Sequence, residues 1–76
     1  GGNDMIVIHM AAMQDKVIAL LESLDGDFTY KFSEKKGIKL FFDVTKGVPD
    51  QAAVVAKNAI KAEPWGTALY FNTEVV

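Results

Sequence analysis

Few side chains in this chain of 76 residues are suited to metal binding or catalysis, and three of them lie close together. His9, Met10 and Met13 combine an imidazole with two thioethers, a set that soft metals such as Cu(I) accept. The chain has no cysteine, however, and thiolates dominate affinity for soft metals. We therefore expect these methionines to fill the protein core, and we predict neither a metal ion nor another cofactor.

The junction that holds these residues resembles that of the heavy-metal-associated metallochaperone domains. Those domains hold Cu(I) with a Met-x-Cys-x-x-Cys loop, and the same junction here reads His9-Met10-Ala11-Ala12-Met13. Leu24-Asp25-Gly26 and Phe42-Asp43 are loosely similar to later parts of the same family. The resemblance implies a shared topology, but both cysteines are missing, so it does not carry the metal function over to this chain.

Catalytic groups are also scarce. The chain has one histidine and only two serines, and no Gly-rich phosphate loop, nucleophile elbow or His-Glu-x-x-His motif occurs. The one acid–base pair that the strand pattern suggests is Asp43 beside His9. We predict that the protein is not an enzyme.

Charge is divided unevenly along the chain. Residues 31–46 hold five lysines and two acidic residues, a sum of +3, whereas the other 60 residues hold three lysines and eight acidic residues, a sum of −5. The net charge of −2 and the absence of arginine are atypical of nucleic-acid-binding domains. No apolar run approaches the roughly 18 residues of a membrane span. We expect neither a nucleic-acid partner nor a membrane.

Apolar periodicity predicts the elements that position these residues. The apolar run Met5–Met10 is typical of a central strand covered on both faces. Apolar residues at helical spacing predict a helix over about Ala11–Asp25, which Gly26 would end in a left-handed conformation. Pro49 is suited to the first turn of a second helix, whose stripe of small residues ends at Pro64.

Alternation with period two predicts a hairpin followed, after the second helix, by a last strand over Thr67–Val75. A three-residue turn over Glu34–Lys36, with Gly37 in the left-handed position, would keep the apolar residues of the hairpin on one face. The predicted cross-strand pairs are Phe32 with Ile38, Tyr30 with Leu40 and Phe28 with Phe42.

The order strand, helix, strand, strand, helix, strand predicts an α+β fold. Right-handed crossovers give the ferredoxin-like split βαβ arrangement (βαββαβ), a four-stranded antiparallel sheet of order 4-1-3-2 with two helices on one face. Residues 5–76 form the single domain of this interpretation. Residues 1–4 are interpreted as a flexible leader or a remnant of cloning.

The same alternation divides the sheet into two faces. The core face is predicted to hold Phe28, Tyr30, Phe32, Ile38, Leu40, Phe42, Leu69 and Phe71. The open face is predicted to bind a partner through Lys31, Lys39, Phe41 and Tyr70, together with Val7 and His9 of the central strand. The run Met5–Met10 does not alternate cleanly, so Ile6 and Ile8 remain the alternative to Val7 and His9 on this face. In this register Lys31 lies opposite Lys39, a repulsion that an acidic partner would relieve.

We therefore expect a small cytoplasmic module that acts by association, either with a protein partner or with a second copy of itself as a homodimer. The alternative is a regulatory domain that senses a small ligand or an anion and resembles the ACT-type domains. Weak Cu(I) binding ranks below both. So does RNA binding through Phe41 and Tyr70, in the manner of RNA-recognition domains, which stack bases on aromatic residues of central strands.

Overall fold

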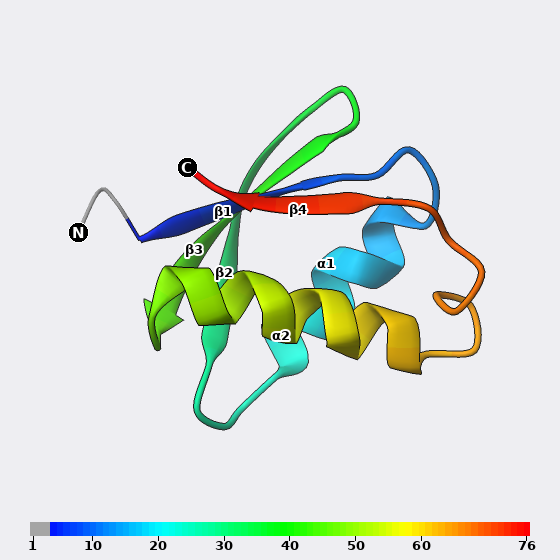
Figure 1. The fold of residues 1–76 in the computed structure, drawn as a ribbon. Helices are drawn as coiled ribbons and strands as arrows, with labels where there is room; N and C mark the ends of the chain where they lie inside the picture. Colours follow the sequence, from blue (N-terminus) through cyan, green and yellow to red (C-terminus); the bar gives the residue numbers. More distant parts are fainter. Residues whose placement is uncertain (1–3) are drawn as a thin grey trace.

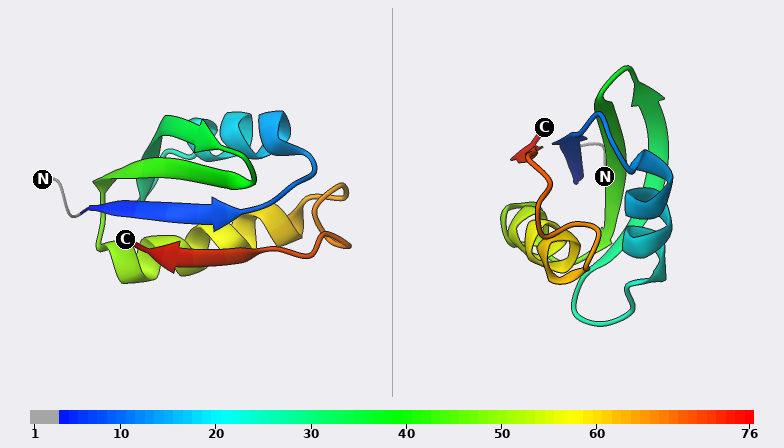
Figure 2. Two further views of the ribbon diagram at one scale, coloured as in Figure 1. Left: turned by 90° about the horizontal axis from the view of Figure 1, so that it is seen from above. Right: turned by 90° about the vertical axis from the view of Figure 1, so that its right-hand side faces the viewer.

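The structure, a computed structural model, describes residues 4–76. Its elements, in chain order, are β1 (Met5–His9), α1 (Gln14–Ser23), β2 (Thr29–Lys36), β3 (Lys39–Lys46), α2 (Pro49–Ala62) and β4 (Asn72–Val75). They form a small α+β domain in which both helices pack against the same face of a four-stranded sheet (Figures 1 and 2). No helix within the described residues is long and apolar enough to cross a membrane.

The sheet is antiparallel throughout, with the strand order β2-β3-β1-β4. Read from the opposite edge, this order is β4-β1-β3-β2. β1 lies between β3 and β4, as the apolar run Met5–Met10 predicts for a central strand. The backbone ladder extends past β4, because the Val76 amide donates to the Met5 carbonyl over 3.0 Å.

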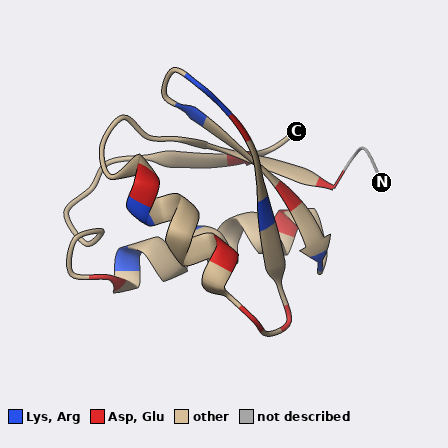
Figure 3. Ribbon diagram, turned by 180° about the vertical axis from the view of Figure 1, so that it is seen from behind, with Lys and Arg blue, Asp and Glu red and all other residues tan. Residues whose placement is uncertain are grey.

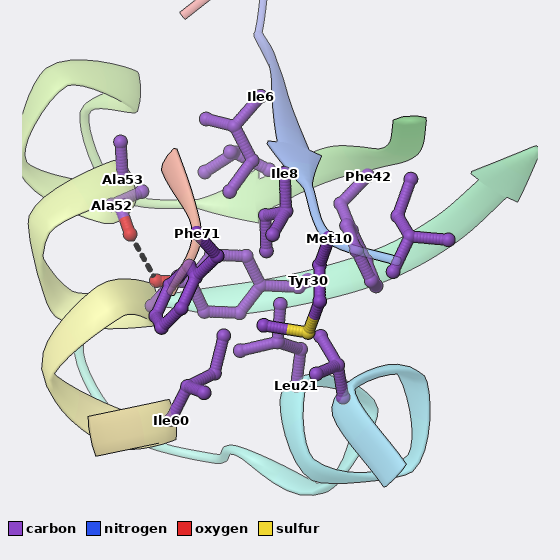
Figure 4. Close-up of a cluster of buried hydrophobic side chains, with 14 residues drawn as sticks. Ile6, Ile8, Met10, Leu21, Tyr30, Phe42, Ala52, Ala53, Ile60 and Phe71 are labelled. Carbon is purple, nitrogen blue, oxygen red and sulfur yellow. Dashed lines mark hydrogen bonds between the residues drawn. The ribbon is translucent and has the colours of Figure 1, made fainter. Parts of the chain in front are cut away.

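The core lies between the sheet and the helices (Figure 4). Ile6 and Ile8 of β1 face it, next to their cross-strand partners Phe42 and Leu40, and all four side chains are fully buried. Among the buried core residues that the structure describes, Tyr30 alone carries a polar side-chain group. Its hydroxyl donates to the Ala52 carbonyl of α2 over 2.6 Å, the dashed line of Figure 4.

The first helix is shorter than predicted at both ends. It begins at Gln14 rather than Ala11, because Met13 adopts a left-handed conformation (φ 59°) just before it. It ends at Ser23, and the extended backbone of Leu24, not Gly26, terminates it, so the predicted glycine cap is wrong. The side chain of Gln14 donates to the carbonyls of Met10 and Gly37, which ties this junction to the β2–β3 turn.

The second helix confirms the sequence prediction more closely. Pro49 occupies the first turn, and the helix ends at Ala62, two residues before Pro64. Its small-residue stripe packs into the core through Ala52, Ala53, Ala56 and Ile60. The chain then turns back so tightly that a Cβ on Gly66 would lie 1.9 Å from the Ile60 carbonyl oxygen. Only glycine fits this close approach.

The predicted hairpin register is wrong. The turn contains only Gly37 and Ile38, and Lys36 pairs with Lys39. Gly37 has a positive φ of 60° at the first turn position, the arrangement of a II′ turn, whose twist matches that of the flanking strands. The two-residue turn, rather than the three-residue turn with glycine last, therefore sets the pairing.

A bulge at Ser33 adjusts this register further along the hairpin. Next to the turn, residues 34–36 of β2 pair with residues 39–41 of β3 in one register. Beyond Ser33 the ladder shifts by one residue, so that Phe32 lies opposite Phe42. Phe32 therefore pairs with Phe42, four residues beyond the predicted partner Ile38. Because this shift is even, Phe32 and Tyr30 stay on the predicted core face. Phe32 and Phe42 pack edge to face, with their ring centroids 5.6 Å apart.

The corrected register changes three residue assignments. Ile38 lies in the turn and is 53% exposed, not in the core. Lys31 lies opposite Asp43, and Lys39 lies opposite Lys36, so the predicted Lys31–Lys39 opposition is wrong. The last strand is also shorter than the predicted Thr67–Val75, because the turns after α2 delay its start to Asn72.

The II′-like turn predicts that alanine destabilises the chain at Gly37 but not at Gly26. A Cβ has open space at both Gly37 and Gly26, but only Gly37 has a positive φ. We expect Gly37→Ala to lower the free energy of unfolding by about 1 kcal/mol. The matched control, Gly26→Ala, should leave it unchanged or raise it by about 0.5 kcal/mol. Urea unfolding of the two variants tests this, and equal losses at both positions would contradict the turn geometry.

Burial raises the pKa of the Tyr30 hydroxyl from 10.0 to about 12. Since the unfolded chain ionises this group more readily, its contribution to stability is present below about pH 10 and is lost as the pH rises towards 12. We expect Tyr30→Phe to cost about 1 kcal/mol at pH 7 and to flatten the loss of stability above pH 10. Urea unfolding of the wild-type chain and of the variant, at pH 7 and at a pH above 10, measures these differences in the free energy of unfolding. A wild-type chain and variant that lose stability in parallel above pH 10 would refute it.

Candidate interaction face

The sheet face opposite the helices is built from alternate residues of the two central strands. Val7 and His9 of β1 lie opposite Phe41 and Lys39 of β3. Their neighbours in sequence, including Ile6 and Ile8, point into the core, so alternation along each strand directs these four residues to the open face. Four of the six predicted site residues are thereby brought side by side.

The centre of this face is apolar. Val7 is only 3% exposed although it does not belong to the core cluster between sheet and helices. Its cross-strand neighbours are Phe41 on one side and Glu74 on the other. Phe41 itself is half-buried, so part of its ring is in contact with solvent. Because Val7 is already covered, the partly exposed ring of Phe41 is the apolar contact that the centre of this face offers.

Ion pairs flank the apolar centre. On the β4 side, Nε2 of His9 contacts Oε1 of Glu74. On the β2 side, Nζ of Lys36 lies 3.7 Å from Oε1 of Glu34, and it also lies 5.8 Å from the centroid of the Phe41 ring. The Lys36–Glu34 pair is solvent-exposed and contributes little to stability, whereas in the other pair Glu74 is exposed and His9 is partly buried. Their effect is to surround Phe41 and Val7 with charges of both signs.

Lys39 is the exception to this pairing. Its cross-strand neighbours are Lys36 on β2 and His9 on β1, and the described residues place it in no ion pair. Three basic side chains thus follow one another across three strands at the turn end of the sheet. Figure 3 shows the lysines of both hairpin strands near the turn. This basic row replaces the predicted Lys31–Lys39 pair as the place where like charges meet.

Two of the predicted residues lie away from this centre. Lys31 lies on the edge strand β2, opposite Asp43, at the other end of the face. Tyr70 precedes β4 and is fully exposed beside a cavity near the end of α2. The sequence prediction missed Lys36 and Glu34, whereas Glu74 was predicted on the open face but not as a site residue. The first two could have been found from Gly37, had it been assigned to the first position of a two-residue turn.

The arrangement does not assemble a metal or acid–base site from the residues singled out by sequence. Met10 is 2% exposed and its sulfur lies in the core (Figure 4), whereas His9 lies on the opposite face. Asp43 pairs with Met5, at the other end of β1 from His9, so the suggested acid–base pair does not form. Among residues 4–76 no group of three His, Cys, Asp or Glu side chains could hold a metal ion.

Comparison with known proteins gives no relative. No family model, no curated protein and no solved structure matches the chain.

The basic row predicts that reversing the charge of Lys39 stabilises the fold. We expect Lys39→Glu to raise the free energy of unfolding by about 0.5 kcal/mol, because it replaces the cross-strand repulsion from Lys36 with an attraction. The gain should shrink as salt is added. Lys46→Glu is the matched control, since Lys46 lies opposite the uncharged Thr29 on the same pair of strands. Thermal unfolding at low and high salt measures both, and a loss of stability in Lys39→Glu would contradict the repulsion.

Proposed function

We propose that this chain is a non-catalytic interaction module of the ferredoxin-like type that associates with a second copy of itself through the open sheet face. The observation that carries the proposal is the apolar centre formed by Phe41 and Val7 on the face that neither helix covers. An apolar centre within a polar rim is the usual anatomy of a protein interface.

The charges of the face support a second copy as the occupant. Around the apolar centre, the three lysines Lys31, Lys36 and Lys39 are balanced by the three carboxylates Glu34, Asp43 and Glu74. Two such faces can therefore meet without net repulsion. The unpaired charge of Lys39 would gain an acidic partner that its own chain does not supply.

The size of the domain supports association as well. A chain of this length buries only about 60% of its unfolded surface, so its own core supplies limited stability. Binding of a second folded copy adds to that stability by mass action. Covering the solvent-exposed part of Phe41 also removes apolar area from water, which contributes roughly 25 cal/mol for each Å² buried.

Analytical ultracentrifugation over a wide range of concentration tests the proposal. We expect the weight-average mass of the wild-type chain to rise with concentration towards that of a dimer. Phe41→Asp should keep the mass at that of the monomer, because it replaces the apolar ring with a carboxylate that association would have to remove from water. The control is Val54→Asp, which changes an equally apolar, 57% exposed residue of α2 away from the sheet and should associate like the wild type.

Circular dichroism establishes that each variant is folded, and Phe41→Ser replaces Phe41→Asp where the charge prevents folding. A wild-type chain that stays monomeric at every concentration would refute self-association. Equal weakening by Phe41→Asp and Val54→Asp would refute the assignment of the face. A monomer that binds an acidic protein through Phe41 and Lys39 would instead make the occupant a different partner.

A further inference from the structure

A cavity of 420 Å³ lies at the turn end of the molecule, outside the apolar centre of the open face. Four parts of the chain form its walls: the last turns of α2, the segment entering β4, the end of β1 and the β2–β3 turn. These parts contribute Lys57 and Lys61, Tyr70 to Asn72, His9 and Ile38, respectively. The volume falls within the range of small-molecule sites, roughly 300–1,000 Å³.

The lining of this cavity is basic. Lys57 and Lys61 are one helical turn apart and so lie on the same side of α2. Neither forms an ion pair within the described residues, and no carboxylate lines the cavity. Glu74 lines a second cavity, which shares His9, Ile38 and Asn72 with this one, and it is already paired with His9. The site therefore holds two uncompensated positive charges in a chain whose net charge is −2.

Contacts within the chain hold Lys61 in place. Its ammonium donates to the Leu69 carbonyl over 2.6 Å and lies 5.2 Å from the centroid of the Phe71 ring. Since an ammonium has three donors, this arrangement leaves hydrogens available to a ligand. A lysine already ordered in this way loses less conformational entropy on binding than a free one.

The wall of the cavity is basic, whereas its rim is apolar. Tyr70 is fully exposed, and Ile38 is 53% exposed in the turn on the other side. Neither side chain contributes to the core cluster. A ligand with a flat ring could lie against these two side chains and remove both from water.

We propose that this cavity binds a small phosphate monoester that carries an aromatic ring. Lys57 and Lys61 hold the phosphate, whose two negative charges match two ammonium groups, and the Asn72 side chain offers a further hydrogen-bond donor. Tyr70 and Ile38 contact the ring. The site uses neither Phe41 nor Val7, so it lies beside the apolar centre of the proposed association surface, with His9 at the border between them.

Phenyl phosphate is the probe for the test, with phenol as its uncharged counterpart. We expect phenyl phosphate to shift the amide resonances of Tyr70, Asn72 and His9 in a saturable manner, and phenol to leave them unchanged. Lys57→Gln should raise the dissociation constant about fivefold, the effect of one partly exposed charge. Tyr70→Ala should raise it by a similar factor through loss of the ring contact.

Lys46→Gln is the matched control, since it removes the charge of an exposed lysine that does not line the cavity, and it should bind like the wild type. Phe41→Asp should also bind normally, which separates this site from self-association. Shifts that fail to saturate, or equal effects of Lys57→Gln and Lys46→Gln, would overturn the proposal, because they indicate attraction to surface lysines in general.

Discussion

The two-residue turn at Gly37 and Ile38 is the constraint on which the rest of the structure depends. The positive φ of Gly37 fixes the register in which β2 and β3 pair next to the turn, and that register determines which side chains meet there on each face. The turn also receives hydrogen bonds from the start of the first crossover, through the Met10 amide and the Gln14 side chain. One glycine conformation therefore positions both the hairpin and the end of β1 against α1.

The bulge at Ser33 makes this turn compatible with the core. A tight turn alone would continue one register along the whole hairpin, whereas the bulge adds one residue to β2 and brings Phe32 opposite Phe42. The aromatic pair then closes the core beneath α1, and Tyr30 reaches the Ala52 carbonyl of α2. Turn and bulge together separate the basic row near the turn from the apolar packing further along the strands.

Features that depend on residues close together in the sequence could be predicted, whereas features that depend on pairing between distant residues could not. Element order, the central position of β1 and the limits of α2 could be predicted, because apolar periodicity and the prolines act locally. The hairpin register could not, since pairs such as Tyr30–Val44 depend on a bulge that no residue type announces. The site shows the same division. Phe41 was placed by alternation, whereas the apolar run of β1 left open whether Val7 and His9 or Ile6 and Ile8 face outward, and Tyr70 was displaced by the turn that follows α2.

The edges of the sheet limit how this domain can assemble. The strand β4 has only four residues, and the other edge, β2, carries the bulge together with Lys31, Lys35 and Lys36. Short, bulged or lysine-bearing edges resist the addition of another strand. Growth of the sheet from chain to chain, the route to fibres, is thereby discouraged. Contact through one shared face, by contrast, closes on itself after two copies, so the geometry favours a finite assembly over an open-ended one.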